Sequence, residues 1–526
     1  MPAMTVTRHV VRVGTRCIHY RRAGSGPPLL LIHQSPRSSA EYAALMEAWQ
    51  GDFTLIAPDT PGFGQSEPLD SAAPEIEDYA DALVAFLDAL GIARIGAYGY
   101  HSGAIILITA ARRHPERFSA IAANGYAVWL PEERELFGAR YTPAFRPLPY
   151  GEHLVWAWNR MLEQGWFFPW YDCRPATRLP RPHDDPAALQ PALMDLLGSG
   201  DAYRLGYGAV LRARREVPPA DAVTPPVLLT AAEGDPLQPH LARLGPLPSR
   251  WRVCAADSRA AADALCHAHL RAHPAPALPP VLPDAPDRGF VRVEAAGFAG
   301  LIHWIGARGA TRLVLHGPGR AAAAVTDPQC LAIDLPGHGL SDAWPGAAPD
   351  NLAAWSAVVI AAARALGCAP AEVMGESWSA LLAVDVAHGL AAPVAQAVEG
   401  VLPMPETAAD WAAAELPDLT PERTGAHLLR AWAAVRARHF FWPWFRATAA
   451  TAIPFDPADI TAERLAAEHL ALLRARNGEA LLALLATVDR PSLLAEAGAA
   501  GVEIRWPLPD WVASRPDVWR PGRSTV

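Results

Sequence analysis

The sequence predicts an α/β protein of two consecutive domains, each a mostly parallel, doubly wound sheet with a helical cap. Three observations support this fold class. The chain of 526 residues is longer than a single hydrophobic core usually serves. Its motifs recur at an offset of about 275 residues. Within each half, short apolar runs alternate with segments of helical periodicity, which is typical of parallel sheets with helices on both faces.

The repeat is clearest in one segment of 22 residues. GEHLVWAWNRMLEQGWFFPWYD at 151–172 aligns without a gap with GAHLLRAWAAVRARHFFWPWFR at 425–446, and eight of the 22 positions are identical. The sequence DTPGFGQS at 59–66 likewise recurs as DLPGHGLS at 334–341. We therefore predict a tandem duplication.

The domain limits follow from composition. The stretch 273–287, HPAPALPPVLPDAPD, is rich in proline and has neither helical nor strand periodicity, so we predict a linker there. The predicted domains are 1–272 and 288–526. Their predicted caps span about 127–220 and about 402–498.

The elements of each half follow the same order. In the first half, apolar runs predict strands at 28–33, 53–58 and 92–98, and helical spacing predicts helices at 76–90 and 105–111. In the second half, the segments 313–316 and 330–334 correspond to the first two strands, and 352–366 corresponds to the first helix. The segment 371–384 corresponds to the third strand together with the helix that follows it. Right-handed crossovers between parallel strands would cover both faces of each sheet.

Bulk composition excludes several classes of function. The net charge of −9 gives no basic face for nucleic acid. All 45 basic residues are arginine, so lysine chemistry of the phosphate-loop or Schiff-base kind is absent. The six cysteines are scattered, without a CxxC pair or metal-ligand spacing, and we predict no metal and no cofactor. No apolar run has the length of a signal peptide or membrane span, so we expect a cytoplasmic protein with no membrane partner and leave its oligomeric state open.

A strand-to-helix turn in the second half carries a candidate nucleophile. The motif Gly375-Glu376-Ser377-Trp378-Ser379 has small residues two positions before and after Ser377, which such a sharp turn needs for steric reasons. With His316-Gly317-Pro318-Gly319 and the DxPGxGxS segment, it resembles the α/β-hydrolase superfamily. Capped members such as epoxide hydrolases, haloalkane dehalogenases and proline iminopeptidases are the most similar. The resemblance occurs once per half and implies two α/β-hydrolase-type domains.

The first half carries histidine at the corresponding turn. In Gly99-Tyr100-His101-Ser102-Gly103 the glycines bracket His101. Ser102 at the apex would put Tyr100 where only a small side chain fits. We therefore predict His101 at the apex, either as a polar filler of a decayed site or as a catalytic group.

The resemblance also indicates where the acids and bases should stand. In the first half, Asp235 follows a predicted strand at the position of the family's orienting carboxylate, but residues 256–259 lack the family histidine. In the second half, Asp510 pairs with Asp235 at the repeat offset. Only 16 residues follow Asp510, so we expect the last strand and its histidine loop to be missing.

A replacement base is His427, in the predicted second cap. Caps of this fold lie over the nucleophile turn, so His427 is a candidate base for Ser377. Because His153 occupies the same position in the first half, bracing of a cap helix is an alternative role.

The oxyanion hole of this superfamily uses the backbone N–H after the nucleophile and one from the loop after the third strand. In the second half the resemblance assigns the first donor to Trp378. The loop there is His316-Gly317-Pro318, and Pro318 has no N–H, so the second donor is lost unless a shifted loop supplies it from Gly317 or Gly319. In the first half the resemblance assigns the two roles to Ser102 and Ser35.

Both predicted caps are rich in aromatic residues. Large rings line apolar ligand pockets or pack a cap onto its base. In the second cap the candidate substrate-binding residues are Trp432, Trp442 and Trp444. A small apolar carbonyl compound is the predicted ligand.

Three functional hypotheses remain. The first is a hydrolase that cleaves an ester, thioester or related carbonyl bond through Ser377, with His427 or another histidine as base and Asp510 orienting it. The second is a catalytically degenerate protein that binds a ligand or has a regulatory role. The third is a cofactor-free lyase or isomerase that uses His101 as a base.

Overall fold

The computed structural model describes residues 6–180, 182–214, 216–279, 281–324, 327, 329–513 and 515–521. By contacts the chain divides into two compact units. The first comprises Met1–Arg146 and His153–Ala285, and the second comprises Pro147–Glu152 and Pro286–Val526. Each is described by itself below.

The first unit contains an eight-stranded sheet in the order β1-β2-β4-β3-β5-β6-β7-β8. The pairs β1–β2 and β2–β4 are antiparallel, and the other neighbours are parallel. The strands are β1 (Thr7–Val13), β2 (Arg16–Ala23), β3 (Pro28–Ile32), β4 (Thr54–Pro58), β5 (Ile95–Tyr100), β6 (Phe118–Asn124), β7 (Val227–Ala232) and β8 (Trp251–Ala256).

Helices cover both faces of this sheet. Leu30 and Ile32 of β3 join the core beneath α2 (Ile76–Ala89) and α3 (Ser102–Arg113). Leu29 and Leu31 join the opposite core, beneath α1 (Ala43–Trp49) and α8 (Arg259–Arg271). Strand β3 is buried at every position because alternate side chains enter different cores.

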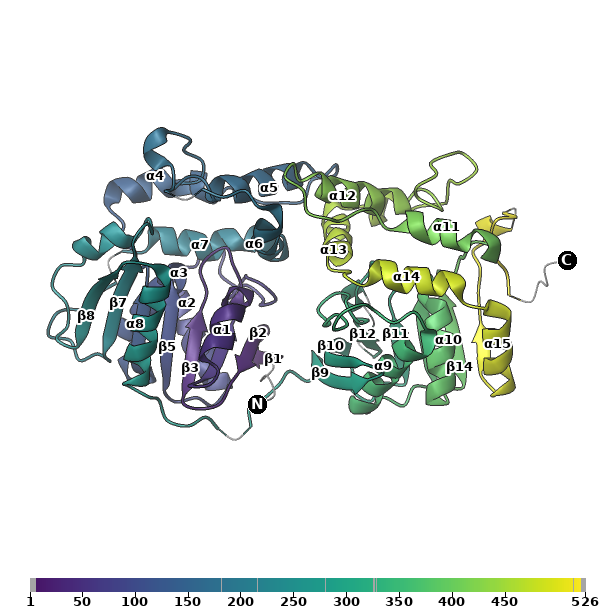
Figure 1. Cartoon of the computed structure of the whole chain (residues 1–526), viewed down its shortest axis with the longest axis horizontal. Helices are drawn as coiled ribbons and strands as arrows, with labels where there is room; N and C mark the ends of the chain where they lie inside the picture. The colour runs from purple at the N-terminus through teal and green to yellow at the C-terminus, as the bar shows by residue number, and fades with distance from the viewer. Residues whose placement is uncertain are drawn as a thin grey trace. The chain divides into compact units, whose positions relative to one another are not determined.

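The cap of the first unit lies between β6 and β7 in the sequence. Figure 1 shows its helices along the edge of the sheet at which β5 and β7 end. They are α4 (Pro131–Tyr141), α5 (Glu152–Gln164), α6 (Pro186–Ser199) and α7 (Tyr203–Arg212).

The second unit contains a seven-stranded sheet in the order β9-β10-β12-β11-β13-β14-β15. This is the order and direction of the first seven strands of the other sheet. The strands are β9 (Arg288–Ala295), β10 (Phe298–Gly306), β11 (Arg312–Leu315), β12 (Leu331–Ile333), β13 (Glu372–Glu376), β14 (Val394–Val398) and β15 (Glu503–Arg505). Within the described part of the chain, β8 has no counterpart in this sheet.

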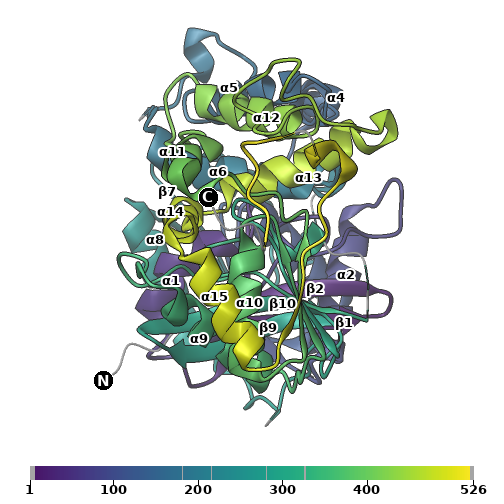
Figure 2. The same ribbon diagram turned by 90° about the vertical axis from the view of Figure 1, so that its right-hand side faces the viewer.

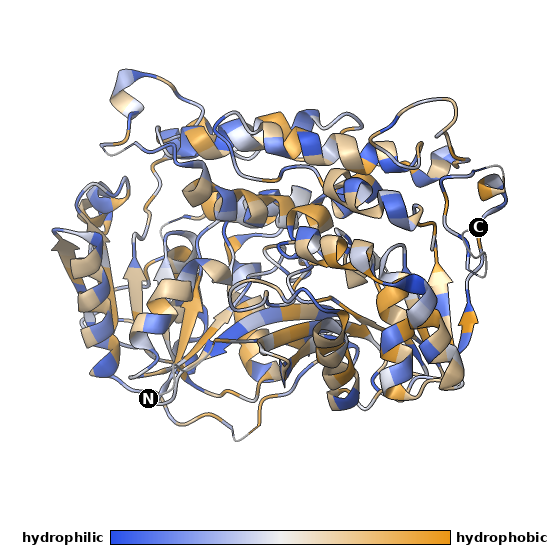
Figure 3. Ribbon diagram, turned by 45° about the vertical axis from the view of Figure 1, so that its right-hand side comes forward, coloured by the Kyte–Doolittle hydropathy of each residue, from blue (hydrophilic) through white to orange (hydrophobic). Residues whose placement is uncertain are grey.

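Figure 2 shows α15 beside α10 in the second unit, with the cap helices above them. The helices that flank this sheet are α9 (Leu352–Ala365), α10 (Ser379–Leu390) and α15 (Arg490–Ala499). The cap helices are α11 (Pro405–Glu415), α12 (Ala426–Arg438), α13 (Ala462–Leu473) and α14 (Gly478–Thr487). Figure 3 shows hydrophilic and hydrophobic residues interspersed along the cap helices, as expected for amphipathic helices that pack on one side.

The expectation that both faces of the second sheet are covered is wrong for its central strands. In β13 and β14 only alternate residues are buried, whereas β6 of the first unit is buried throughout. The cause is that the described part of the second unit has no helices equivalent to α1 and α8. The polar Glu372 and Gln396 lie on the partly exposed face, as is typical of a half-solvated sheet.

The predicted parallel strands and helices match the observed ones to within a few residues. The hairpins β1–β2 and β9–β10, and the strands β6 and β14, were not predicted. No helix in the described ranges combines the length and the apolar character that crossing a membrane requires.

Candidate active site

His101 lies at the sharp turn between β5 and α3. Its backbone has φ 49° and ψ −108°, which is unusual for a non-glycine residue. A side chain at Gly103 would collide with the carbonyl of Ile32, and one at Gly99 would collide with Gly103 itself. The small residues on both sides of His101 therefore permit the turn and place the imidazole at its apex.

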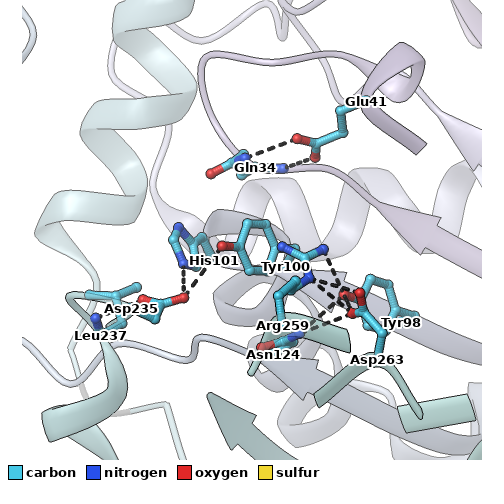
Figure 4. Close-up of polar contacts among 10 residues, drawn as sticks. All are labelled: Gln34, Glu41, Tyr98, Tyr100, His101, Asn124, Asp235, Leu237, Arg259 and Asp263. Carbon is cyan, nitrogen blue, oxygen red and sulfur yellow. Dashed lines mark hydrogen bonds and ion pairs between the residues drawn. The ribbon is translucent and has the colours of Figure 1, made fainter. Parts of the chain in front are cut away.

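Asp235 meets His101 directly. Asp235 lies on the turn after β7, and its Oδ2 is 2.8 Å from His101 Nε2. The exposed fractions of the two side chains are 22% for His101 and 7% for Asp235. Because a carboxylate only accepts, the proton of the neutral imidazole is on Nε2, and Nδ1 carries the lone pair. Figure 4 shows the second ring nitrogen pointing away from Asp235.

The Asp235 carboxylate is ionised and held by three donors. Besides His101 Nε2, it accepts from the Leu237 N–H at 2.8 Å and from the Tyr100 hydroxyl at 3.3 Å. Burial alone would raise the pKa of Asp235, but His101 and these hydrogen bonds outweigh burial and lower it.

Tyr100 and Arg259 complete a stack of three side chains. The Tyr100 ring stacks on His101 with a centroid separation of 3.9 Å and an interplanar angle of 22°. The Arg259 guanidinium lies 3.9 Å from the Tyr100 centroid and is bound to Asp263 at 2.9 Å. Burial and the nearby Asp235 charge raise the pKa of Tyr100, so its hydroxyl remains a donor.

Sequence reasoning missed the roles of Tyr100 and Arg259. Arg259 stands in the segment where the family histidine was expected, and Tyr100 was treated only as too large for a flanking position. The available signal was the simultaneous replacement of the nucleophile and the base, which indicates a rearranged site.

The predicted oxyanion donors of the first domain lie together. Ser102 is the first residue of α3, so its N–H is in the helical turn that lacks intrahelical acceptors. The N–H of Ser35 donates to Ser102 Oγ at 3.2 Å. The neighbouring Gln34 N–H is bound to Glu41 at 2.7 Å. An incoming oxygen would therefore compete with Ser102 Oγ for the Ser35 N–H.

Ser377 occupies the equivalent turn of the second unit. Its φ is 52°, and a side chain at Gly375 would collide with Ser379. A Cβ atom on Gly317 would lie 3.3 Å from the Cβ of Ser377, so the predicted oxyanion loop is adjacent to it. Trp378 is buried and provides the following N–H.

The predicted partners of Ser377 are not bonded to it. The Ser377 hydroxyl makes no hydrogen bond to a histidine anywhere in the described ranges. His427 is fully buried in α12, where its Nδ1 accepts from the Glu422 N–H at 3.4 Å. Burial lowers the pKa of His427. Asp510 is exposed and begins the short 3-10 helix η8 (Asp510–Val512).

Charged side chains border the Ser377 turn instead. Arg320 Nη1 is 2.9 Å from Glu399 and 3.5 Å from Glu376. The positive charge of Arg320 and the negative charges of the two glutamates compensate one another. Within the described residues, neither carboxylate is bonded to Ser377.

The three candidate tryptophans of the second cap pack on other side chains. Trp432 is 2% exposed and contacts the His469 ring. The Trp442 ring lies 4.8 Å from Trp411, and Trp444 Nε1 donates to the Glu415 carbonyl. Their substrate-binding role stays a prediction.

Among the residues that the structure describes, no three or more potential metal ligands form a group.

Comparison with known proteins identifies the fold family. Residues 27–147 match the family model described as alpha/beta hydrolase fold. Haloalkane dehalogenase 2 of Mycobacterium tuberculosis is 32% identical over 112 residues, which are 21% of this chain and 39% of that protein. Bifunctional epoxide hydrolase 2 of Rattus norvegicus is 34% identical over 119 residues, which are 22% of this chain and 21% of that protein.

A solved enol-lactonase from Burkholderia xenovorans LB400 is 20% identical, with a TM-score of 0.38 over 49% of this chain and 97% of that chain. The curated relatives are matched over 39% of their length or less in the two cases above. The family model matched over residues 27–147 and the two mostly parallel sheets together show an α/β-hydrolase fold.

Proposed function

We propose that the first domain hydrolyses an ester or related carbonyl bond of a small apolar molecule. In this proposal His101 is the general base and Asp235 orients it. The observation that carries this proposal is the 2.8 Å hydrogen bond between His101 Nε2 and Asp235, formed at the turn where this fold presents its catalytic group. The relatives named as hydrolases support hydrolysis as the reaction class.

The proposed mechanism needs no second histidine. Asp235 orients the imidazole and stabilises the positive charge that develops on it. His101 Nδ1 takes a proton from water as that water attacks the carbonyl carbon. The N–H groups of Ser102 and Ser35 receive the developing oxyanion at the positive end of α3. His101 then returns the proton to the leaving oxygen.

The first cap favours an apolar substrate. An aromatic cluster packs beneath its helices, and large rings of this kind exclude water from a ligand. Its members are Trp129, Phe137, Tyr141, Trp156, Phe168, Trp170, Tyr171 and Tyr207.

Hydrolysis through Ser377 is the second candidate, favoured by its strained turn and its partly exposed position. A serine hydroxyl needs an adjacent base to attack, and no base is bonded to Ser377 among the described residues. Binding without turnover is the remaining alternative for both domains.

The test is hydrolysis of p-nitrophenyl phenylacetate by four forms of the full chain. We expect His101→Gln to lower kcat by about 10²–10⁴-fold and Asp235→Asn to lower it by about tenfold or more, because both remove general-base assistance. Ser377→Ala is the matched control and should keep wild-type turnover.

Three results would count against the proposal: wild-type protein without turnover, an active His101→Gln variant, or loss of turnover in Ser377→Ala. The first result would favour a binding protein, and the third would favour the serine hydrolase. Circular dichroism of each variant checks that the fold is intact.

A further inference from the structure

The first cap buries an arginine whose charge is incompletely satisfied. Arg160 projects from α5 and is 1% exposed. Its Nη1 donates to Gln164 at 2.8 Å, but its Nε and Nη2 have no hydrogen-bond partner among the described residues. No carboxylate in the described part of the chain pairs with it.

Aromatic rings surround this guanidinium. It lies 5.4 Å from the Trp170 centroid and 5.8 Å from the Tyr203 centroid. Its charge also acts on Tyr141 and Tyr207, whose hydroxyls are 3.3 Å apart. Contacts of a cation with ring faces recover only part of the hydration that burial removes.

The two unpaired nitrogens define a specific geometry. Nε and Nη2 form one edge of the planar guanidinium, and their N–H bonds point in the same direction. That edge binds the two oxygens of one carboxylate through parallel hydrogen bonds. The unpaired edge therefore matches a carboxylate better than a single-atom acceptor.

The predicted repeat shows that a cap of this kind does not need the arginine. Ala434 stands at the position of Arg160 in the second cap. Trp170 and Trp444 are also aligned, and each indole N–H donates to the carbonyl of the last residue of a cap helix, Tyr141 or Glu415. The indole thus makes the same hydrogen bond whether or not an arginine stands at this position of the neighbouring helix.

A series of ring contacts connects Arg160 with the surroundings of His101. The Tyr141 ring packs on Phe137 at 5.3 Å, and Phe137 packs on Trp129 at 5.1 Å. Trp129 then packs on His240, which follows the Asp235 turn. A ligand whose apolar body replaced part of this packing would extend from Arg160 to the surroundings of His101.

We propose that Arg160 binds a carboxylate group of the first domain's ligand, so that the substrate class is an apolar carboxylic acid that carries the reacting carbonyl bond at its other end. The assignment of the reacting end of the substrate rests on the proposed function, whereas the assignment of Arg160 as the carboxylate site does not. Water does not reach the unpaired nitrogens, so a ligand enters only as the cap side chains move apart.

Binding is tested first, with no need for turnover. The probes are 4-phenylbutyrate and its uncharged amide, added at millimolar concentration to the full chain. We expect 4-phenylbutyrate to raise the Tm for unfolding of the first domain and the amide to raise this Tm much less. Arg160→Met should abolish the difference. His101→Gln should preserve it.

Arg146→Ala is the matched control, because Arg146 is a 71% exposed cap residue paired loosely with Asp201. Arg160→Met keeps the aliphatic stem and removes a buried charge, so we expect it to fold with a Tm no lower than that of the wild type.

Turnover then tests the link to the reaction. Mono-p-nitrophenyl glutarate should be preferred over p-nitrophenyl butyrate in kcat/KM, and Arg160→Met should reduce that preference by about tenfold or more.

The proposal is overturned if acid and amide stabilise the wild type equally or not at all, or if Arg160→Met retains the difference. Carboxylate-dependent binding without any hydrolysis would support the Arg160 site while contradicting the proposed reaction. The two failures are therefore distinguishable.

Discussion

An imidazole at the strand-to-helix turn changes what the rest of the site must supply. A serine there depends on a histidine for its proton and on a carboxylate to orient that histidine. In the proposed mechanism His101 is itself the proton acceptor, and it binds Asp235 directly, so the absence of a histidine at 256–259 would not remove the base. Arg259 occupies that segment and supports the Tyr100 ring instead.

Tyr100 is predicted to be a positioning residue. Its hydroxyl donates to Asp235, and its ring covers one face of His101. We expect Tyr100→Phe to keep the stack and lower kcat by a few-fold with little change in KM, because one hydrogen bond to the carboxylate is lost. Tyr100→Ala should lower kcat by about tenfold or more, because His101 loses its packing. Steady-state kinetics with p-nitrophenyl phenylacetate measure both; equal effects of the two variants would contradict a role for the stack.

At the scale of elements, the same hydrogen bonds connect a strand with a loop in both units: a strand histidine binds an aspartate that also accepts from a loop N–H. In the first unit, His19 Nδ1 donates to Asp59 at 2.8 Å, and Asp59 also accepts from the Ser39 N–H. In the second unit, His303 donates to Asp334 at 2.8 Å, and Asp334 accepts from the Ala322 N–H. A duplicated ancestor would leave such matched bonds, and the duplication stays a prediction.

His240 connects two elements around the candidate site of the first domain. It lies in the 3-10 helix η5 (Gln238–Arg243), and its Nδ1 accepts from the Val128 N–H at the start of the cap segment. Burial, assisted by the Arg243 charge, lowers the pKa of His240 to about 4. His240 is therefore neutral at pH 7 in the folded protein.

This pKa predicts acid sensitivity of the first domain. Between pH 6.5, the ordinary pKa of histidine, and pH 4, the unfolded chain binds a proton that the folded state does not, so the free energy of unfolding falls as the pH falls. His240→Gln keeps an acceptor for Val128 and should remove about 1–2 kcal/mol of the decrease between pH 7 and pH 5. Urea unfolding at several pH values measures this difference. An unchanged pH dependence in His240→Gln would contradict it.

At the scale of the whole molecule, two turns of the same shape carry different chemistry. The first has a paired imidazole and carboxylate, and the second has a hydroxyl with no bonded base among the described residues. The second sheet also ends, over the described residues, at the strand that corresponds to β7, so the position from which the family histidine arises is absent there.

We therefore expect a fluorophosphonate probe to leave Ser377 largely unlabelled in the folded full chain, because an unactivated serine hydroxyl reacts slowly. Intact-mass measurement before and after exposure to the probe gives the extent of labelling, and Ser377→Ala is the control for its site. Rapid labelling that disappears in Ser377→Ala would show that a base reaches the second turn.

The sequence alone was sufficient for the positions of the central parallel strands along the chain and for the position of each nucleophile turn. Apolar runs and helical spacing are local patterns, and so is the need for small residues around His101 and Ser377, since it arises from clashes within a few residues. It was not sufficient for the unpredicted hairpins, nor for the partly exposed face of β13 and β14, because coverage depends on helices that lie elsewhere in the chain.

Only the tertiary structure decided which candidate groups meet. The bond between His101 and Asp235 joins residues 134 positions apart, and the stack on Arg259 and the burial of Arg160 likewise depend on how distant elements pack. The same packing keeps His427 bonded within its own cap and leaves Asp510 exposed. Short-range sterics determine the shape of a turn from its own residues, whereas the partner of a side chain is set by long-range packing that a single sequence does not display.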